Sequence, residues 1–80
     1  MNAKEAVGLR IQELCAQRDL AINGLAHLCG VSPSTIYSML NAKSKNPGVV
    51  SIQKICDGLE ISVRDFFDSP LFENLDPEIQ

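Results

Sequence analysis

Four hydroxyl side chains lie close together near the middle of this 80-residue chain, and a polar loop follows them. The hydroxyl residues are Ser34, Thr35, Tyr37 and Ser38, and the loop contains KSKN over residues 43–46. Hydroxyl groups can donate to and accept from the edges of DNA bases, and lysines can neutralise phosphates. The same residues are also ordinary for a solvated helix surface and a solvated loop. Residue type alone therefore leaves DNA contact and plain solubility both open.

The residues that could support catalysis or bind a metal are few. Cys15, Cys29 and Cys56 stand at apolar helical positions without CxxC spacing, and His27 is the only histidine. This set lacks the ligand spacing of a zinc site. Cys29 and His27 are two residues apart, so a helix would direct them to different sides. With no glycine-rich phosphate loop and no carboxylate pair, we expect neither enzyme activity nor a metal or cofactor.

The segment from Ile22 to Asn41 predicts two short helices with a tight turn between them. Gly30 favours a left-handed end to the first helix, and Ser32 and Pro33 are typical of a helix start, with Ser32 as the cap. Apolar residues recur at helical spacing on one side of each helix, at Leu25, Cys29, Ile36 and Met39. This is the layout of a helix-turn-helix, whose second helix usually enters the DNA major groove.

The flanking segments predict three further helices around one small core, so the expected fold is all-α. Asn2 and Glu5 have capping-box spacing before a helix that runs to about Arg18, with Arg10 and Arg18 facing outward. A fourth helix is expected over about 50–59. Ser62 is expected to cap the fifth helix, with Asp65 as its acidic partner.

The charge is divided unevenly between the body of the chain and its last residues. The net charge is −3, but residues 1–67 hold seven Lys/Arg against six Asp/Glu, a net +1. Residues 68–80 hold four acids and no base, a net −4. Between Asp19 and Asp57 the chain has no acid, so the helix-turn-helix is locally neutral or positive.

The acidic tail over residues 68–80 is a candidate for a short docking or dimerisation helix. Its apolar residues recur at helix-like spacing, at Leu71, Phe72, Leu75 and Ile79. We expect residues 70–80 to pack around Phe66 and Phe67 of the same or a second subunit, with their acids facing away from the DNA. The sequence has no apolar run long enough to span a membrane and no export signal, and its cysteine count is odd. These features predict a cytoplasmic protein without membrane association.

Several motifs together, from about Val7 to Phe67, resemble the Cro/repressor-type helix-turn-helix family, also called the XRE family. They are RIQEL at Arg10–Leu14, LA at Leu25–Ala26, GVSPSTI at Gly30–Ile36, KSKNP at Lys43–Pro47 and ICDGLEISVRDFF at Ile55–Phe67. Each motif alone is weak, but their order and spacing are specific. The resemblance implies a five-helix lambda-repressor-like domain over residues 1–67, with the helix-turn-helix at its second and third helices.

The resemblance also assigns roles to individual residues. The family's base-reading positions correspond to Pro33, Ser34, Thr35, Tyr37 and Ser38. Its phosphate-contacting loop corresponds to Asn41, Lys43, Ser44, Lys45 and Asn46. The sequence departs from the family at Ala21, where a capping Ser or Thr is usual, and at Ile22, where Gln is usual. The cap is therefore lost, and one phosphate contact is reduced to backbone or absent.

The expected function is that of a sequence-specific transcriptional regulator of the repressor kind. It would bind double-stranded DNA as a homodimer, with the third helix in the major groove of an operator. The alternative is a protein-interaction module, such as an antitoxin or an accessory factor of a mobile element. The acidic tail favours this alternative, and the sequence leaves both open.

Overall fold

The structure is a computed structural model that describes residues 1–41 and 46–79 of the chain. Within these residues it contains helices and no strands, so the all-α prediction is confirmed. The helices are α1 (Ala3–Gln17), α2 (Ile22–Cys29), α3 (Pro33–Leu40), α4 (Val49–Leu59), α5 (Val63–Phe67) and a short 3-10 helix, η1 (Pro70–Phe72).

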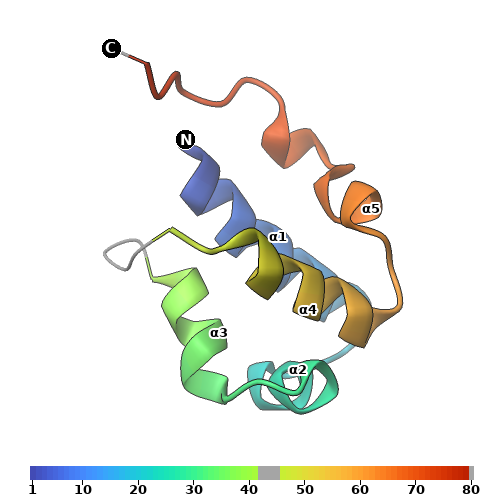
Figure 1. The fold of residues 1–80 in the computed structure, drawn as a ribbon. Coiled ribbons are helices and arrows are strands. Elements are labelled where there is room, and N and C mark those ends of the chain that lie inside the picture. The colour runs from blue at the N-terminus through green and yellow to red at the C-terminus, as the bar shows by residue number, and fades with distance from the viewer. Residues whose placement is uncertain (42–45, 80) are drawn as a thin grey trace.

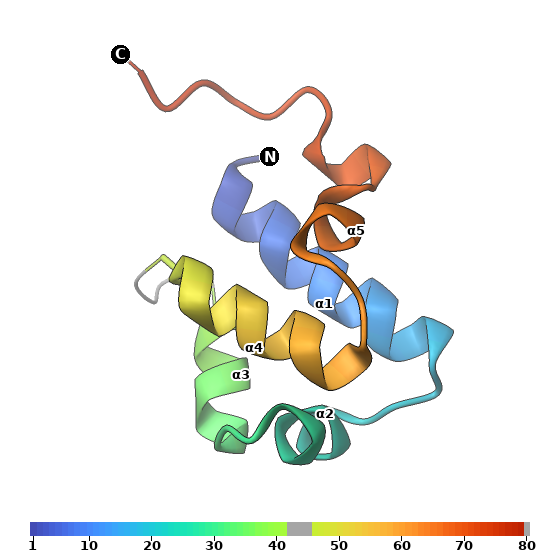
Figure 2. The ribbon, with the colours of Figure 1, turned by 45° about the vertical axis from the view of Figure 1, so that its right-hand side comes forward.

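The helices surround one apolar core (Figures 1 and 2). α2 packs against α3 and α4, and α3 also packs against α1. α5 and η1 lie at the opposite side of the molecule from α2 and α3. Phe66 of α5 is completely buried and closes the core from that side. The core residues come from all five α-helices: Val7, Ile11, Leu14, Cys15, Leu25, Ala26, Ile36, Met39, Ile52, Ile55, Cys56, Leu59 and Phe66.

Both predicted capping boxes are confirmed. The Asn2 side chain accepts from the Glu5 backbone N–H at 2.8 Å, and the Glu5 carboxylate accepts from the Asn2 N–H at 3.4 Å. At the start of α5, the Ser62 hydroxyl accepts from the Asp65 N–H at 2.9 Å, and the Asp65 carboxylate accepts from the Ser62 N–H at 3.3 Å. Each box satisfies two N–H groups that a helix start leaves without partners.

The helices α1, α2 and α4 end in the same way. Their last turns close with a left-handed residue, Asp19 (φ 51°), Gly30 (φ 67°) or Glu60 (φ 57°). The next N–H then donates to a carbonyl five residues back, at 2.9, 3.1 and 3.0 Å respectively. The residues that donate, Leu20, Val31 and Ile61, also pack on the core. Gly30 was predicted, whereas Asp19 and Glu60 adopt this conformation without the freedom of glycine.

The prediction that Arg10 faces outward is wrong, because its side chain does not face solvent. Its side chain is only 8% exposed and crosses from α1 to α5. Its Nε donates to the Phe66 carbonyl at 2.6 Å, its Nη2 donates to the Asp65 carbonyl at 2.8 Å, and Nη1 pairs with Glu13. A guanidinium provides several donors in a fixed fork, which suits the two carbonyls at the end of this short helix. Arg18 is exposed, as expected.

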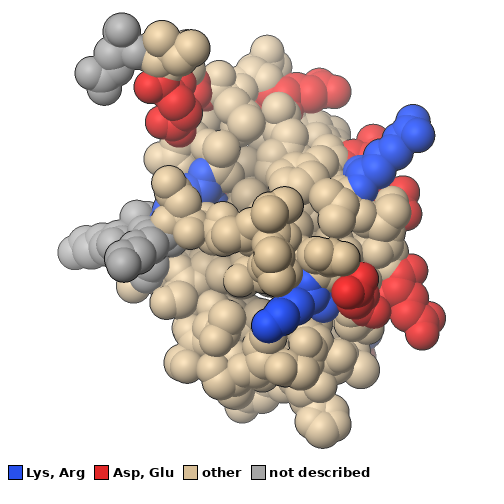
Figure 3. All heavy atoms as spheres, in the orientation of Figure 1, with Lys and Arg blue, Asp and Glu red and all other residues tan. Residues whose placement is uncertain are grey.

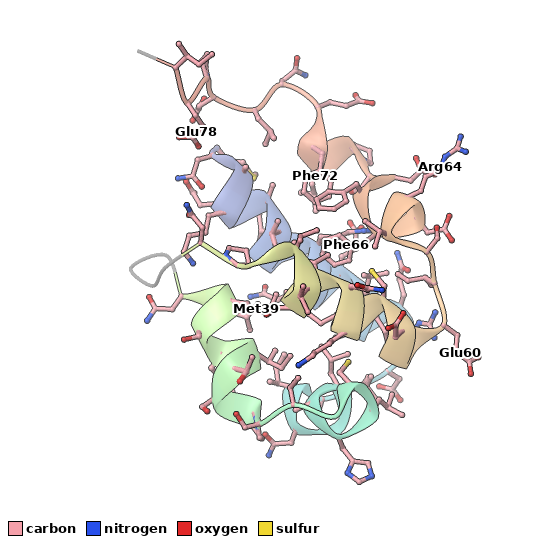
Figure 4. All side chains as sticks on the ribbon, viewed as in Figure 1. Met39, Glu60, Arg64, Phe66, Phe72 and Glu78 are labelled. Atoms are coloured by element: carbon pink, nitrogen blue, oxygen red, sulfur yellow. The ribbon has the colours of Figure 1, made fainter. Side chains whose placement is uncertain are left out.

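The helix-like spacing of the apolar residues in the tail does not produce a continuous helix, since only η1 is helical in the described part of the tail. Asn74 is left-handed (φ 61°), and the chain continues without regular structure to Ile79, which is 92% exposed. Phe72 does pack beside the last helix, with ring centroids 6.2 Å from Phe66 and 4.8 Å from Phe67 (Figure 4). Docking of the tail at Phe66 therefore occurs within the same chain, through η1.

Candidate nucleic-acid interface

α3 divides cleanly into a buried and an exposed side. Ile36 and Met39 lie in the core, and Figure 4 shows Met39 directed toward α4. The predicted base-reading residues lie on the other side: Pro33, Ser34, Tyr37 and Ser38 are exposed and Thr35 is partly exposed. Tyr37 is the largest of them and is 54% exposed. The structure thus brings the predicted residues together on one accessible helix face.

The hydroxyl groups at the start of α3 bond to one another. Ser32 Oγ lies 3.0 Å from Ser34 Oγ and 3.0 Å from Thr35 Oγ1. The predicted side-chain cap at Ser32 is wrong, because this hydroxyl makes no bond to the helix N–H groups and only the Ser32 carbonyl accepts, from Thr35 N–H at 3.0 Å. These contacts fix the orientation of Ser34 and Thr35. The Tyr37 and Ser38 hydroxyls have no hydrogen bond to any described residue, which leaves both available to a ligand.

The predicted phosphate-contacting residues are placed only in part. Asn41 directly follows α3 and Asn46 lies before α4, and both are exposed. Lys43, Ser44 and Lys45 lie outside the described residues. The Asn41 carbonyl accepts a hydrogen bond from Lys4 of α1 at 2.5 Å.

The start of α2 has the structure expected from its missing cap. Ala21 has the extended conformation of a capping residue (φ −78°, ψ 160°) but no side-chain oxygen to offer. Its carbonyl still accepts from Leu25 N–H at 2.9 Å. Ile22 packs on the core instead of reaching outward. This helix start can therefore offer backbone N–H groups to an anion, but no side chain from either position.

The charge distribution distinguishes the α2–α3 end from the rest of the molecule. Figure 3 shows acidic side chains along the tail, on α5 and at the end of α4, whereas the part of this face over α2 and α3 has none. The sequence accounts for this pattern, since it has no acid between Asp19 and Asp57. Phosphate would meet no carboxylate of α2 or α3, so the local field does not oppose DNA despite the net charge of −3.

Sequence reasoning missed Lys4 as part of this region. Lys4 and Gly8 are one helical turn apart on the side of α1 that faces α3. The helical spacing of Lys4 and Gly8 was visible in the sequence. Contact with α3 was not, because it depends on how two helices far apart in sequence pack together.

The described residues give no support for a metal site or for a reactive cysteine. No cluster of three or more His, Cys, Asp or Glu residues in the described chain is arranged to hold a metal ion. Burial raises the pKa of the Cys15, Cys29 and Cys56 thiols, which lowers the fraction of reactive thiolate at neutral pH. Among the described helices, none combines the length and the apolar character that crossing a bilayer requires.

Comparison with known proteins identifies a family and a similar solved structure. The family model for Cro/C1-type helix-turn-helix DNA-binding domains matches residues 10–70. The crystal structure of the prophage Lp1 protein 11 is similar, with a TM-score of 0.79 and 42% sequence identity, over 88% of this chain and 93% of that one. No curated protein is significantly similar. The lambda-repressor-like fold expected from the sequence is thus shown.

Proposed function

The chain belongs to the Cro/C1-type helix-turn-helix DNA-binding family, and we propose that it is a transcriptional repressor that binds a specific operator. The observation that carries the proposal is the exposed polar face of α3 in a region without acids. An α-helix fits the major groove, where each base pair presents its own pattern of donors and acceptors. Domains of this family are generally non-enzymatic, and the proposal assigns no catalytic role.

Within this proposal, Tyr37 and Ser38 read base edges, because their hydroxyls are exposed and have no partner among the described residues. The remaining α3 contacts come from Pro33, Ser34 and Thr35 at the helix start. Arg, Asn and Gln, which make the bidentate contacts to guanine and adenine, are missing from this face. Specificity then rests on single hydroxyl bonds and on contact between the Tyr37 ring and a thymine methyl.

The phosphate contacts are assigned to the ends of the loop between α3 and α4 and to its lysines. These residues are Asn41, Lys43, Ser44, Lys45 and Asn46. Residues 1–67 form the DNA-binding domain and residues 68–80 an accessory tail. Two such domains, related by a twofold axis in a cytoplasmic homodimer, would bind two half-sites.

One observation favours the alternative, a protein-interaction module. Val49 and Val50 at the start of α4 are 69% and 60% exposed, although both are apolar. Adjacent exposed apolar side chains are more typical of a protein contact than isolated ones. Such a module would bind a partner protein with the same affinity in the presence and absence of excess DNA. A repressor that uses this surface only to form its own dimer would not bind a partner protein in this way.

Salt dependence tests the proposal at the level of DNA binding. About four phosphate contacts per subunit, doubled in a dimer, predict a slope near −7 for log affinity against log salt. Replacing Lys43 and Lys45 with Ala should flatten the slope by about 4 and weaken binding to all sequences about equally. Filter binding or fluorescence anisotropy at several salt concentrations measures this slope.

Arg64→Ala is the matched control for the two lysine variants. Arg64 is exposed on α5, and Figure 4 shows its side chain directed away from α3. Removing this charge should leave the slope nearly unchanged. Binding that does not depend on salt in the unsubstituted protein would contradict the proposed function.

A further inference from the structure

The first turn of α1 reaches the end of α3, which is 37 residues away in the sequence. Lys4 Nζ donates to the Asn41 carbonyl at 2.5 Å, and the Lys4 side chain is partly buried there. Asn41 is the residue at which α3 ends. The contact thus joins the helix that would enter the groove to the longest helix of the domain.

Asn41, the residue at which α3 ends, is not left-handed. Asn41 is extended (φ −85°, ψ 118°), and its N–H donates to the Ser38 carbonyl at a long 3.3 Å. The last carbonyls of a helix have no partners within it and carry partial negative charge. An ammonium group from a neighbouring helix supplies both a donor and a compensating charge. Lys4 thus supplies a donor and a positive charge at the end of α3.

A second contact, one turn further along α1, fixes the same end of α3. A Cβ placed on Gly8 would lie 3.5 Å from the Met39 carbonyl oxygen and 3.6 Å from the Leu40 Cα. These are ordinary contact distances, so the backbone of α1 lies directly against the last turn of α3. The two helices are therefore in contact at Gly8, and Lys4 bonds to the end of α3 one turn earlier along α1.

We propose that Lys4 is a positioning residue that fixes the orientation of α3, and hence its sequence specificity, without contacting DNA. The inference rests on the proposed function of α3 as the base-reading helix. Single hydroxyl contacts depend strongly on direction, so a small rotation of α3 would misplace Tyr37 and Ser38 together. Non-specific binding depends mainly on phosphate charge and tolerates the same rotation.

The test compares Lys4→Met and Lys4→Arg with the unsubstituted protein. Affinity is measured for the best DNA duplex selected from a random pool and for an unrelated duplex, each over a range of salt. Lys4→Met should lower the ratio of the two affinities about tenfold and leave the affinity and salt slope on the unrelated duplex unchanged. Lys4→Arg should restore part of the ratio, since it keeps the charge and a donor. Arg64→Met, which removes a cation remote from α3, should leave the ratio unchanged.

Two results would overturn the inference. An equal loss on both duplexes, with the slope reduced by about one per subunit, would make Lys4 a direct phosphate contact. An unchanged ratio would show that its bond to Asn41 has no effect on specificity.

Amide hydrogen exchange distinguishes failure of the inference from failure of the proposed function. In Lys4→Met, exchange at Met39, Leu40 and Asn41 should become at least severalfold faster, while the midpoint of thermal unfolding changes little. If the unsubstituted protein bound no DNA, the proposed function would fail whatever exchange showed. Exchange unchanged at these amides would reject the positioning role of Lys4 independently of DNA.

Discussion

Replacing Gly58 by Ala is expected to destabilise the domain by about 2–3 kcal/mol, because α2 and α4 meet at this residue. A Cβ at Gly58 would lie 2.6 Å from Cys29 Sγ, 3.0 Å from Cys29 Cα and 3.0 Å from the Leu28 carbonyl oxygen. Two of these atoms belong to the backbone of α2, so a side-chain rotation cannot relieve the contact. Overpacking costs typically 1–3 kcal/mol, and this site lies at the upper end because the helices themselves must separate. Thermal or urea unfolding of the variant measures the loss.

Gly8→Ala is the matched control for Gly58→Ala. Both glycines lie inside helices, where Ala is favoured over Gly by about 1 kcal/mol. At Gly8 the nearest atom to a new Cβ is 3.5 Å away, so nothing has to move. Gly8→Ala should therefore stabilise the domain by about 0.5–1 kcal/mol. Equal stabilisation by both substitutions would show that α2 and α4 do not make this close contact.

The second large effect is expected at Arg10. Arg10→Met keeps most of the side-chain volume but removes the donors to the Phe66 and Asp65 carbonyls and the pairing with Glu13. Hydrogen bonds from charged groups contribute about 1.5–3 kcal/mol, and a buried carbonyl left without a partner adds a cost of its own. The free energy of unfolding should fall by about 2–4 kcal/mol. Arg10→Lys should lose part of this, because an ammonium cannot reproduce the fork.

Arg18→Met controls for the removal of a cation from α1. Arg18 is exposed near the end of the same helix, so its replacement should change stability by less than about 0.5 kcal/mol. Urea unfolding followed by circular dichroism compares the variants. A loss at Arg10 no larger than at Arg18 would contradict the assignment of Arg10 as the link between α1 and α5.

Features that depend on neighbouring residues could be predicted from the sequence. The boxes at Asn2 and Ser62 and the left-handed Gly30 follow from the chemistry of a few consecutive residues. The buried side of α3 follows from helical periodicity, which places Ile36 and Met39 together. The flanking segments predicted the remaining helices, and the family resemblance implied how all five are arranged.

Features that depend on distant parts of the chain could not be predicted in this way. Arg10 is buried because it bonds to two carbonyls at the end of α5, and nothing near Arg10 in the sequence indicates them. The apolar spacing of the tail predicted a helix, but Phe72 packs on Phe67 through a single 3-10 turn. Beyond it, Pro77 lacks the N–H that a continuing helix would use.

The candidate site likewise has features that depend on neighbouring residues and features that depend on distant ones. The exposed face of α3 could be predicted, because helical spacing places its polar residues on one side and its apolar residues on the other. The bonds of the Ser32 hydroxyl to Ser34 and Thr35 could not, since a capping bond and a bond between hydroxyls suit the same residue equally well. The role of Lys4 depends on the packing of α1 against α3 and required the structure.

Selection of duplexes from a random DNA pool tests whether the exposed face of α3 reads bases, and it should be run with the unsubstituted protein and with Tyr37→Ala and Ser38→Ala. We predict enrichment of one motif, with two related half-sites as an inverted repeat. Each substitution should relax the preference at one or two base pairs by about 1–3 kcal/mol. Failure to enrich any sequence, or the same motif with the same preferences from all three proteins, would contradict base reading by the exposed face of α3.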